Sequence, residues 1–321
     1  MSRLTPSLIR VIREIRRGGF PERILFHGAA PGDNLLLSAV CRELRKRGAK
    51  RIWIQSPFPE LFSKREVATV LALSEPAIAL LWRAGLIVRP ERVDYGANDR
   101  ELQRTLAIER HILAEMCARA GVAGEVELRT NLELTNRQKR VGRIASNQIA
   151  IQSSGLSANL PLRNKEWYVE RFQQVSQVLC RNFTVVQLGS AKDPPLEGAH
   201  DLRGRTSLIQ AAGVLSSSKL FIGLEGFLAH LARAVNTRSV IVYGGRAPPQ
   251  HSGYICNSNV STQISCSPCW NWSRCDFDRA CMKQITVEAV LQASYKQLER
   301  FAQPLEVATA WVQPGKRRIT E

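Results

Sequence analysis

Apolar runs alternate with polar, glycine-containing turns through the first part of the chain. The run at residues 23–28 predicts a strand, residues 35–47 predict a helix, and residues 51–56 predict a second strand. Residues 64–120 have a mostly helical pattern, and residues 125–135 have an extended, linker-like one. A strand, a helix and a further strand in this order predict a βαβ unit with parallel strands.

A second series of alternating segments follows a basic stretch. The predicted strands with their loops cover residues 148–155, 183–190, 220–226 and 239–245, and the predicted helices cover residues 166–180, 207–217 and 227–235. The alternation predicts an α/β protein with two Rossmann-like domains that join near residues 137–146. In such domains, ligands bind beyond the carboxyl ends of the strands.

The changes of pattern along the chain predict its division into segments. These are an N-terminal helix at residues 1–22, one Rossmann-like domain at residues 23–145, a second at residues 146–300 with a cysteine-rich insert at residues 256–281, and a tail at residues 301–321.

Residues 4–17 have the spacing of a basic amphipathic helix. Leu4, Leu8, Ile12 and Ile15 form an apolar stripe, and arginines lie between them. One interpretation places this stripe in the interface of an anionic lipid surface. The other packs the helix on the surface of its own domain. Both interpretations remain open from the sequence.

The charge of the chain indicates an anionic partner. Lys and Arg number 45 against 28 Asp and Glu, a formal net charge of +17. A nucleic acid is disfavoured because neither an RNP-like aromatic pattern nor a DNA-reading helix is recognisable. Arginines interrupt any signal-peptide core near the N-terminus, and Ser74, Glu75 and Pro76 interrupt the most apolar later stretch. We therefore expect a cytoplasmic protein that contacts the inner face of the plasma membrane peripherally.

Glycine-rich turns follow several of the predicted strands. They are "HGAAPGD" (27–33), "QSSGLS" (152–157), "QLGSAKD" (187–193), "GLEG" (223–226) and "YGGRAPP" (243–249). Glycine permits close backbone approach, and free amides at a helix N-terminus bind anions, so the set predicts a phosphate-bearing ligand. A P-loop and a standard dinucleotide fingerprint are both missing from the sequence.

Asp33 is a lone acid at the junction between the first predicted strand and helix. It has the residue type of an N-cap for a helix that begins near Asn34. It also has the chemistry of a general base, since a carboxylate can accept a proton from a hydroxyl group. The two roles do not exclude each other.

Four stretches resemble the heptosyltransferase family of glycosyltransferases, glycosyltransferase family 9. They are "PGDNLLLSAV" (31–40), "KEWYVERF" (165–172), residues 201–223, and "GLEGFLAHLARAV" (223–235). Their order and approximate spacing match the family over residues 23–295. The resemblance implies the GT-B fold, in which two Rossmann-like domains with parallel sheets face a central cleft.

The resemblance also implies an activity and its residues. The reaction is an inverting transfer from a nucleotide-sugar donor similar to ADP-heptose, with the acceptor on the N-terminal domain and the donor on the C-terminal domain. Asp33 matches the family's catalytic base, and no cofactor is required for catalysis. The positions implied to bind the donor are Lys165, Gly189, Gly204, Thr206, Glu225, Gly226 and His230.

The sequence departs from the family pattern at the donor site. The family's Asp-Ser-Gly is replaced by Glu225, Gly226 and Phe227. A longer acid, a lost hydroxyl group and a bulky aromatic ring change the pocket around the sugar, so the identity of the donor sugar remains open.

A cysteine cluster lies near the end of the second domain. Cys266, Cys269, Cys275 and Cys281 have the spacing C-x2-C-x5-C-x5-C, and four thiolates suit tetrahedral zinc or iron. Similar stretches in some family members imply a structural element. Reduced buried thiols and disulfides are the alternatives.

Taken together, the resemblance implies an inverting glycosyltransferase that moves a heptose or a related sugar. The predicted acceptor is a lipopolysaccharide-core-like or other surface glycan, in the form of an anionic glycolipid or glycan. A heptosyltransferase that modifies a protein, and a non-catalytic GT-B binding protein, are the alternatives that remain open.

Overall fold

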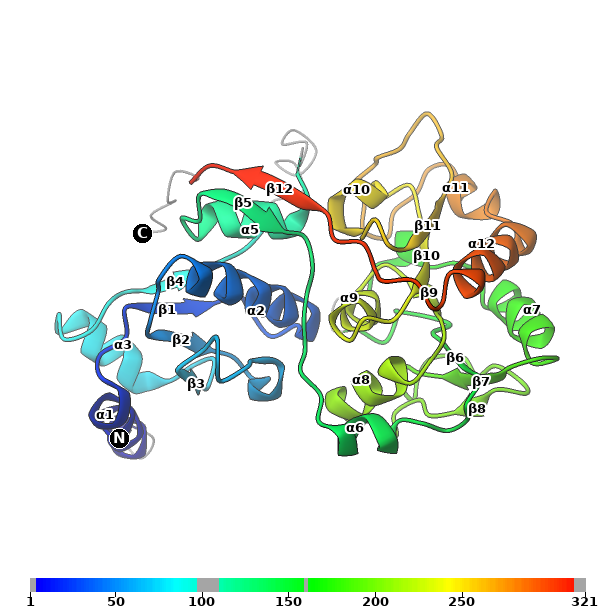
Figure 1. Ribbon diagram of the computed structural model, residues 1–321. Coiled ribbons are helices and arrows are strands. Elements are labelled where there is room, and N and C mark those ends of the chain that lie inside the picture. The colour runs from blue at the N-terminus through cyan, green and yellow to red at the C-terminus, as the bar shows by residue number, and fades with distance from the viewer. Residues whose placement is uncertain (1–3, 97–109, 159–160, 315–321) are drawn as a thin grey trace. The chain divides into compact units, whose positions relative to one another are not determined.

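The computed structural model of the protein describes residues 4–96, 110–158 and 161–314 (Figure 1). It divides into two compact units. Unit 1 comprises Met1–Tyr95, Leu113–Leu132 and Thr309–Glu321, and unit 2 comprises Gly96–Ile112 and Glu133–Ala308. The pattern of the sequence assigns residues 301–321 to a tail, whereas residues 309–312 form a strand of unit 1.

Unit 1 is an α/β unit. Its helices are α1 (Leu4–Gly18), α2 (Pro31–Lys46), the 3-10 turn η1 (Pro59–Leu61), α3 (Pro76–Arg83) and α5 (Ile112–Arg119). Its strands are β1 (Arg23–Phe26), β2 (Ile52–Gln55), β3 (Thr69–Leu71), β4 (Pro90–Arg92), β5 (Gly124–Glu127) and β12 (Thr309–Val312).

The parallel sheet of unit 1 has the strand order β3-β2-β1-β4. Its central strands are apolar and buried, with Ile24 of β1 paired to Trp53 of β2. Because β2 and β4 lie on opposite sides of β1, the strand order reverses at β1. Loops that follow β1 and β4 therefore meet at a topological switch point, where open α/β sheets bind ligands.

Helix α1 packs on unit 1 through a face that contains Leu8 and Ile15 of the predicted stripe but not Ile12. Val11 is buried in a cluster with Ile24 and Trp53, and Leu8 and Ile15 pack against that cluster. Ile12, which belongs to the predicted stripe, is 42% exposed. The difference arises at Ser7, which is buried because its hydroxyl group donates to Glu75 and accepts from the Ala77 amide.

The described residues between 64 and 120 are less helical than their pattern predicts, and residues 97–109 of this predicted segment lie outside the described ranges. β3 and β4 are strands of three residues each, too short for a period of two to be distinguished from helical spacing. β5 is likewise a strand within the segment predicted as a linker, and it pairs antiparallel with β12. The Arg42 guanidinium holds the end of β5 and the segment after it by donating to the carbonyl groups of Glu127 and Arg129.

Unit 2 is a larger α/β unit. Its helices are α6 (Asn136–Val141), the 3-10 turn η2 (Arg163–Lys165), α7 (Val169–Leu179), α8 (Leu208–Ser216), α9 (Phe227–Ala234), α10 (Pro249–Ser252), α11 (Ala280–Lys283) and α12 (Val287–Glu299). Its strands are β6 (Gln148–Ile151), β7 (Thr184–Gln187), β8 (His200–Asp201), β9 (Phe221–Leu224), β10 (Ser239–Tyr243) and β11 (Ser258–Ser261).

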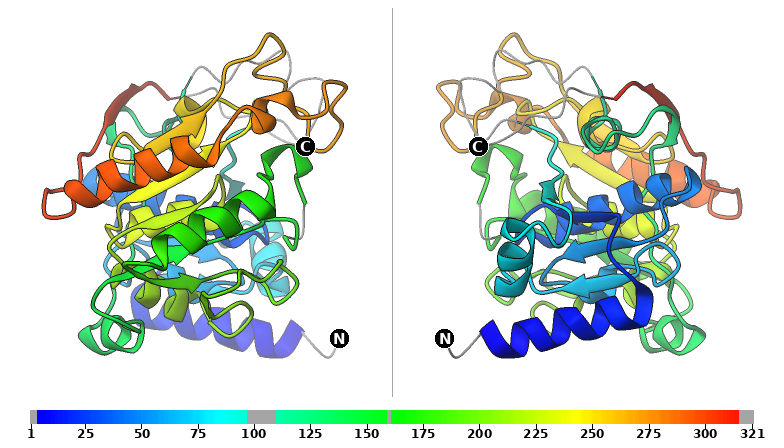
Figure 2. Two further views of the ribbon diagram at one scale, coloured as in Figure 1. Left: turned by 90° about the vertical axis from the view of Figure 1, so that its right-hand side faces the viewer. Right: turned by 90° about the vertical axis from the view of Figure 1, so that its left-hand side faces the viewer.

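The parallel sheet of unit 2 has the strand order β11-β10-β9-β6-β7-β8. Helices α7 and α12 lie side by side on one face of this sheet, while α8 and α9 cover the other (Figures 1 and 2). Phe172 of α7 and Val290 of α12 are fully buried in the core beneath them. The strand order reverses between β6 and β9, so the loops after these strands flank the second switch point.

Helix α6 approaches α8 closely enough to exclude side chains at two glycines. A Cβ atom on Gly213 would lie 2.5 Å from the carbonyl oxygen of Gln138, and one on Gly142 would lie 2.0 Å from the backbone of Gly213. Thr135 begins α6 with a capping box, in which its side chain and that of Gln138 satisfy each other's backbone amides.

No helix in the described ranges combines the length and the apolar composition that a membrane span requires.

Candidate active site

The lone acid of the first predicted junction does not cap its helix. α2 begins at Pro31, with Ala30 as an N-cap that makes no side-chain hydrogen bond, and Asp33 lies within the first helical turn. Proline is favoured at a first helical position because its missing N–H is not needed there. The interpretation of Asp33 as the cap is therefore wrong, and its carboxylate is available for other contacts.

Asn34, the residue after Asp33, holds the loop before α2 in place. The Asn34 side chain is fully buried, and its amide donates to the carbonyl oxygens of Gly28 at 2.9 Å and Ala30 at 2.8 Å. These bonds fix the backbone between β1 and α2. They place Asp33 at the carboxyl end of β1, which is the switch point of unit 1.

Two side chains that the sequence does not single out surround the Asp33 carboxylate. The Tyr95 hydroxyl group donates to its Oδ1 at 3.0 Å, and the His27 Nδ1 lies 3.4 Å from its Oδ2. The rings of His27 and Tyr95 stack with their centroids 5.6 Å apart. Tyr95 follows β4 and His27 follows β1, so this cluster assembles from both sides of the switch point.

The charge of His27 bears on the Asp33 carboxylate beside it. Burial lowers the pKa of His27 below its usual range, against the opposing charges of Asp33 and Asp94. The imidazole is therefore neutral at neutral pH. The Asp33 side chain is 23% exposed, so a ligand can reach it.

In unit 2, two of the predicted donor-site residues form an ion pair. Glu225 follows β9 directly, and its Oε2 lies 2.5 Å from the Nζ of Lys165, which ends η2. Burial alone would raise the pKa of Glu225, but the charges of Lys165 and Arg246 outweigh it and lower the pKa to about 2. Ser252 also donates to the Glu225 Oε1, at 3.3 Å.

The turn that carries Lys165 is anchored from two directions. The Asn164 side-chain amide donates to the carbonyl oxygen of Arg274 at 2.8 Å, and its backbone N–H donates to that of Trp272 at 3.0 Å. A Cβ atom on Gly244 would lie 2.4 Å from the carbonyl oxygen of Asn164, so the loop after β10 packs directly on this turn. The backbone of Lys165 is therefore held by the residues on either side of this turn.

The loop after β6 is organised by a buried acid that the sequence pattern does not distinguish. Glu166 accepts hydrogen bonds from the Ser154 hydroxyl group at 2.8 Å and from the Gly155 amide at 2.8 Å. Burial raises the pKa of Glu166. Because this loop faces the switch point of unit 2, Glu166 shapes the backbone that a ligand would meet there.

Two of the predicted donor-site glycines have a packing explanation. The Gly204 amide donates to the carbonyl oxygen of Gly189 at 2.8 Å. A Cβ atom on Gly204 would lie 2.7 Å from the Cβ of Ala191, and one on Gly189 would lie 2.4 Å from the Oδ2 of Asp193. Thr206 lies just before α8, whose N-cap is Ser207. Gly226 is the N-cap of α9.

His230 lies in the interior of unit 2. It is 5% exposed, and its Nδ1 lies 2.7 Å from the Tyr254 hydroxyl group. His111 and His251 are close by. Burial, together with the charges of His230 and His251, lowers the pKa of His111 to about 3, and burial lowers that of His251 to about 4 although Glu225 opposes it. His111 and His251 are therefore neutral at neutral pH.

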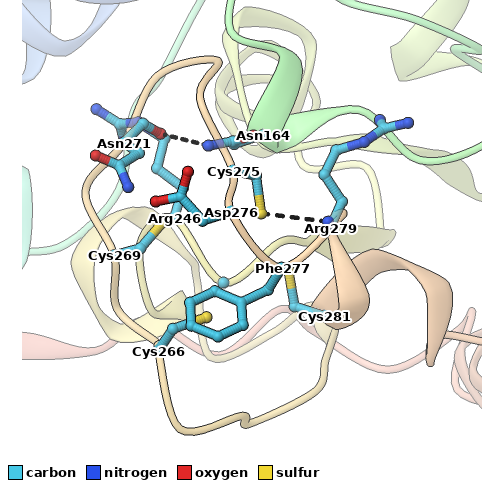
Figure 3. Close-up of a pocket in the computed structure, with 11 residues that line it drawn as sticks. Asn164, Arg246, Cys266, Cys269, Asn271, Cys275, Asp276, Phe277, Arg279 and Cys281 are labelled. Carbon is cyan, nitrogen blue, oxygen red and sulfur yellow. Dashed lines mark hydrogen bonds between the residues drawn. The ribbon is translucent and has the colours of Figure 1, made fainter.

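The four predicted metal ligands line one pocket (Figure 3). Cys266, Cys269, Cys275 and Cys281 surround it together with Arg246. Burial raises the pKa of Cys269. Within the described part of the chain, no group of three or more His, Cys, Asp or Glu side chains is arranged to hold a metal ion. The four thiols are thus neighbours without forming a metal-binding cluster.

Known proteins provide an independent comparison. The model of glycosyltransferase family 9 (heptosyltransferase) matches residues 101–276. No curated protein matches the chain.

Solved structures share the fold at low sequence identity. ADP-heptose lipopolysaccharide heptosyltransferase II of Escherichia coli has a TM-score of 0.62 and 17% identity, covering 87% of this chain and 99% of that one. A family 9 glycosyltransferase of Veillonella parvula has a TM-score of 0.60 and 13% identity, covering 87% and 97%. The iron-containing dodecameric glycosyltransferase TibC of enterotoxigenic E. coli has a TM-score of 0.64 and 17% identity, covering 88% and 77%.

The matched residues exceed half of the chain, and the parallel sheets of both units agree with the GT-B fold of these structures. The chain therefore belongs to glycosyltransferase family 9, the heptosyltransferase family.

Proposed function

We propose that the protein transfers a heptose or a related sugar, with inversion, from an ADP-heptose-like donor to a hydroxyl group of an anionic surface glycan. One observation carries the proposal: Asp33 lies at the switch point of unit 1 as a partly exposed carboxylate that is not used as a helix cap. A related structure was solved in complex with ADP-D-beta-D-heptose. That complex supports the choice of donor.

Asp33 is the proposed general base. The acceptor oxygen forms a bond to the anomeric carbon, opposite the diphosphate, and Asp33 takes the hydroxyl proton. The bond between that carbon and the diphosphate oxygen breaks, and its electron pair leaves with the nucleotide diphosphate. Tyr95 orients the carboxylate through its hydrogen bond to Oδ1. The neutral His27 places no positive charge beside this carboxylate.

Lys165 is the proposed donor-phosphate residue of unit 2. A positive charge close to the leaving diphosphate stabilises the negative charge that develops there. Its ion pair with Glu225 orients the ammonium group before the donor arrives. Arg246 adds a second positive charge near the same carboxylate. Glu225 replaces the family's aspartate with a longer side chain, which changes the pocket around the sugar. The proposal therefore includes sugars related to heptose as well as heptose itself.

The remaining predicted residues take supporting roles in this proposal. Gly189, Gly204 and Thr206 shape the loops at the carboxyl ends of the strands, and Gly226 opens the N-terminus of α9 toward the donor. His230 supports this region from the interior through Tyr254. The histidine cluster is therefore assigned to the framework of the donor site.

The proposed acceptor is lipid-linked and is presented at the inner face of the plasma membrane. The net charge of +17 supports an anionic acceptor. A protein acceptor is the alternative, and acceptor competition between a purified glycolipid and a peptide distinguishes the two.

The cysteines take no part in the proposed reaction. Four thiolates are a donor set that suits tetrahedral zinc or iron, but the described side chains do not form a metal-binding group. We propose only a structural ion, whose binding would draw Cys266, Cys269, Cys275 and Cys281 together.

Replacement of Asp33 by asparagine tests the proposed base. The amide cannot accept the proton, so turnover should fall by about 10²–10⁴-fold. The affinity for ADP-heptose, measured by calorimetry, should stay unchanged because the donor binds to unit 2. Glu91→Gln, on β4 of the same unit, is the matched control. Unchanged turnover in the Asp33 variant would contradict the assignment of the base.

A further inference from the structure

Helix α1 presents to solvent a face that its own unit does not use. Ser7 and Val11 are buried against unit 1, and Leu8 and Ile15 pack beside them. On the outward face, Ile9 is 61% exposed and Ile12 is 42% exposed. The helix is therefore apolar on two faces, of which only one has a packing partner among the described residues.

The exposed isoleucines are set among arginines. On a helix, residues three or four positions apart are neighbours, so Ile9 lies beside Ile12 and Arg13, and Ile12 lies beside Arg16. All four side chains are exposed. Phe20, just beyond the helix, is a further exposed apolar side chain at 57%. The outward face thus combines apolar groups with positive charge.

The carboxylate of Glu14 on α1 lies away from this outward face. Glu14 is 23% exposed and accepts a hydrogen bond from the Thr69 hydroxyl group at 3.3 Å, which turns its carboxylate toward unit 1. Arg17 and Arg13 lie 3.8 Å and 3.9 Å from its other oxygen. The net charge presented outward is therefore positive.

We propose that the outward face of α1, formed by Ile9, Ile12, Arg13 and Arg16, docks on a lipid bilayer that contains anionic phospholipids. The isoleucines enter the boundary between headgroups and acyl chains, and the arginines contact the phosphates. A nucleic acid would use the arginines but would leave the isoleucines in water, so the combination favours a bilayer. The inference deepens the proposed function, since it brings the enzyme to a lipid-linked acceptor.

Vesicle binding by the full-length protein tests the proposal without any transfer reaction. We expect the protein to float with phosphatidylcholine vesicles that contain phosphatidylglycerol and to remain in solution with pure phosphatidylcholine. The double variant Ile9→Ser, Ile12→Ser should bind at least about tenfold more weakly, because it loses the buried apolar area. The double variant Arg13→Gln, Arg16→Gln should bind roughly 25-fold more weakly, at roughly fivefold for each arginine.

Matched controls separate this face from the general positive charge. Two double variants replace the same exposed residue types in unit 2: Ile144→Ser with Ile255→Ser, and Arg143→Gln with Arg181→Gln. Both should bind to the vesicles as the wild type does. Unfolding curves that coincide with the wild type exclude misfolding, since all the residues replaced in α1 are exposed.

Three results would each overturn the proposal. They are failure of the wild type to bind anionic vesicles, equal losses in the α1 variants and the unit 2 controls, and binding to random duplex DNA that competes with vesicles and survives the isoleucine replacements. None of these results bears on Asp33→Asn, so the proposed transfer reaction is tested separately.

Discussion

The ion pair between Glu225 and Lys165 makes a quantitative prediction. Glutamine at position 225 mimics the protonated acid, so its effect on stability at neutral pH follows from the folded-state pKa. A fall of the pKa from 4.5 to about 2 corresponds to about 3 kcal/mol, at about 1.4 kcal/mol per unit. We expect Glu225→Gln to lower the free energy of unfolding of unit 2 by about that amount at pH 7.

The pH dependence has a definite sign. Because the folded-state pKa of Glu225 is depressed, its contribution is fully present above the ordinary pKa of 4.5 and is lost as the pH falls toward 2. More than half of it should be gone at about pH 3. The difference between wild type and Glu225→Gln should therefore shrink in acid and stay constant between neutral and mildly acidic pH.

Urea unfolding followed by circular dichroism measures both effects. Glu170→Gln, on the exposed side of α7, is the control and should change the free energy of unfolding by less than about 0.5 kcal/mol. A double-mutant cycle with Lys165→Met isolates the coupling between the two charges. A Glu225→Gln variant as stable as the control at pH 7 would show that Lys165 and Arg246 do not outweigh the burial of the carboxylate.

Three further predictions concern the rest of the molecule. Tyr95→Phe removes the hydrogen bond to Asp33, so kcat should fall about three- to tenfold with an unchanged donor KM, while Tyr295→Phe on α12 should leave both unchanged. Gly213→Ala forces a Cβ atom against Gln138 and should reduce the free energy of unfolding by about 1–3 kcal/mol, whereas Gly18→Ala, with open space around it, should not; equal Tm values would refute this explanation. Metal analysis of the purified protein should find one zinc or iron ion per chain that is lost in Cys269→Ser, and its absence from the wild type would leave the cysteines as packed thiols.

The sequence predicts those parts of the fold where one pattern persists over many residues. β1, β2, β6, β7, β9 and β10, and the helices α2, α7, α8, α9 that accompany them, lie where the pattern places them. β4 does not, because Pro90–Arg92 is short, charged and partly exposed at the edge of its sheet. Tyr95 follows this strand, and so its approach to Asp33 could not be predicted.

The start of α2 could have been predicted more accurately. Pro31 is a signal for a first helical position, and it places Asp33 inside the helix rather than before it. The buried face of α1 could not have been predicted in the same way. It depends on the contact of Ser7 with Glu75, which lies 68 positions away in the chain.

The pairing of β5 with β12 has a consequence for biosynthesis. Val126 of β5 pairs with Ala310 of β12, and the Thr309 hydroxyl group donates to the side chain of Glu125, 184 positions away in the chain. A ribosome makes β5 early and β12 only after all the strands of unit 2. During that interval β5 presents an open strand edge, a surface prone to aggregation. Unit 1 can therefore be completed only after the whole of unit 2 has been synthesised and is available to fold.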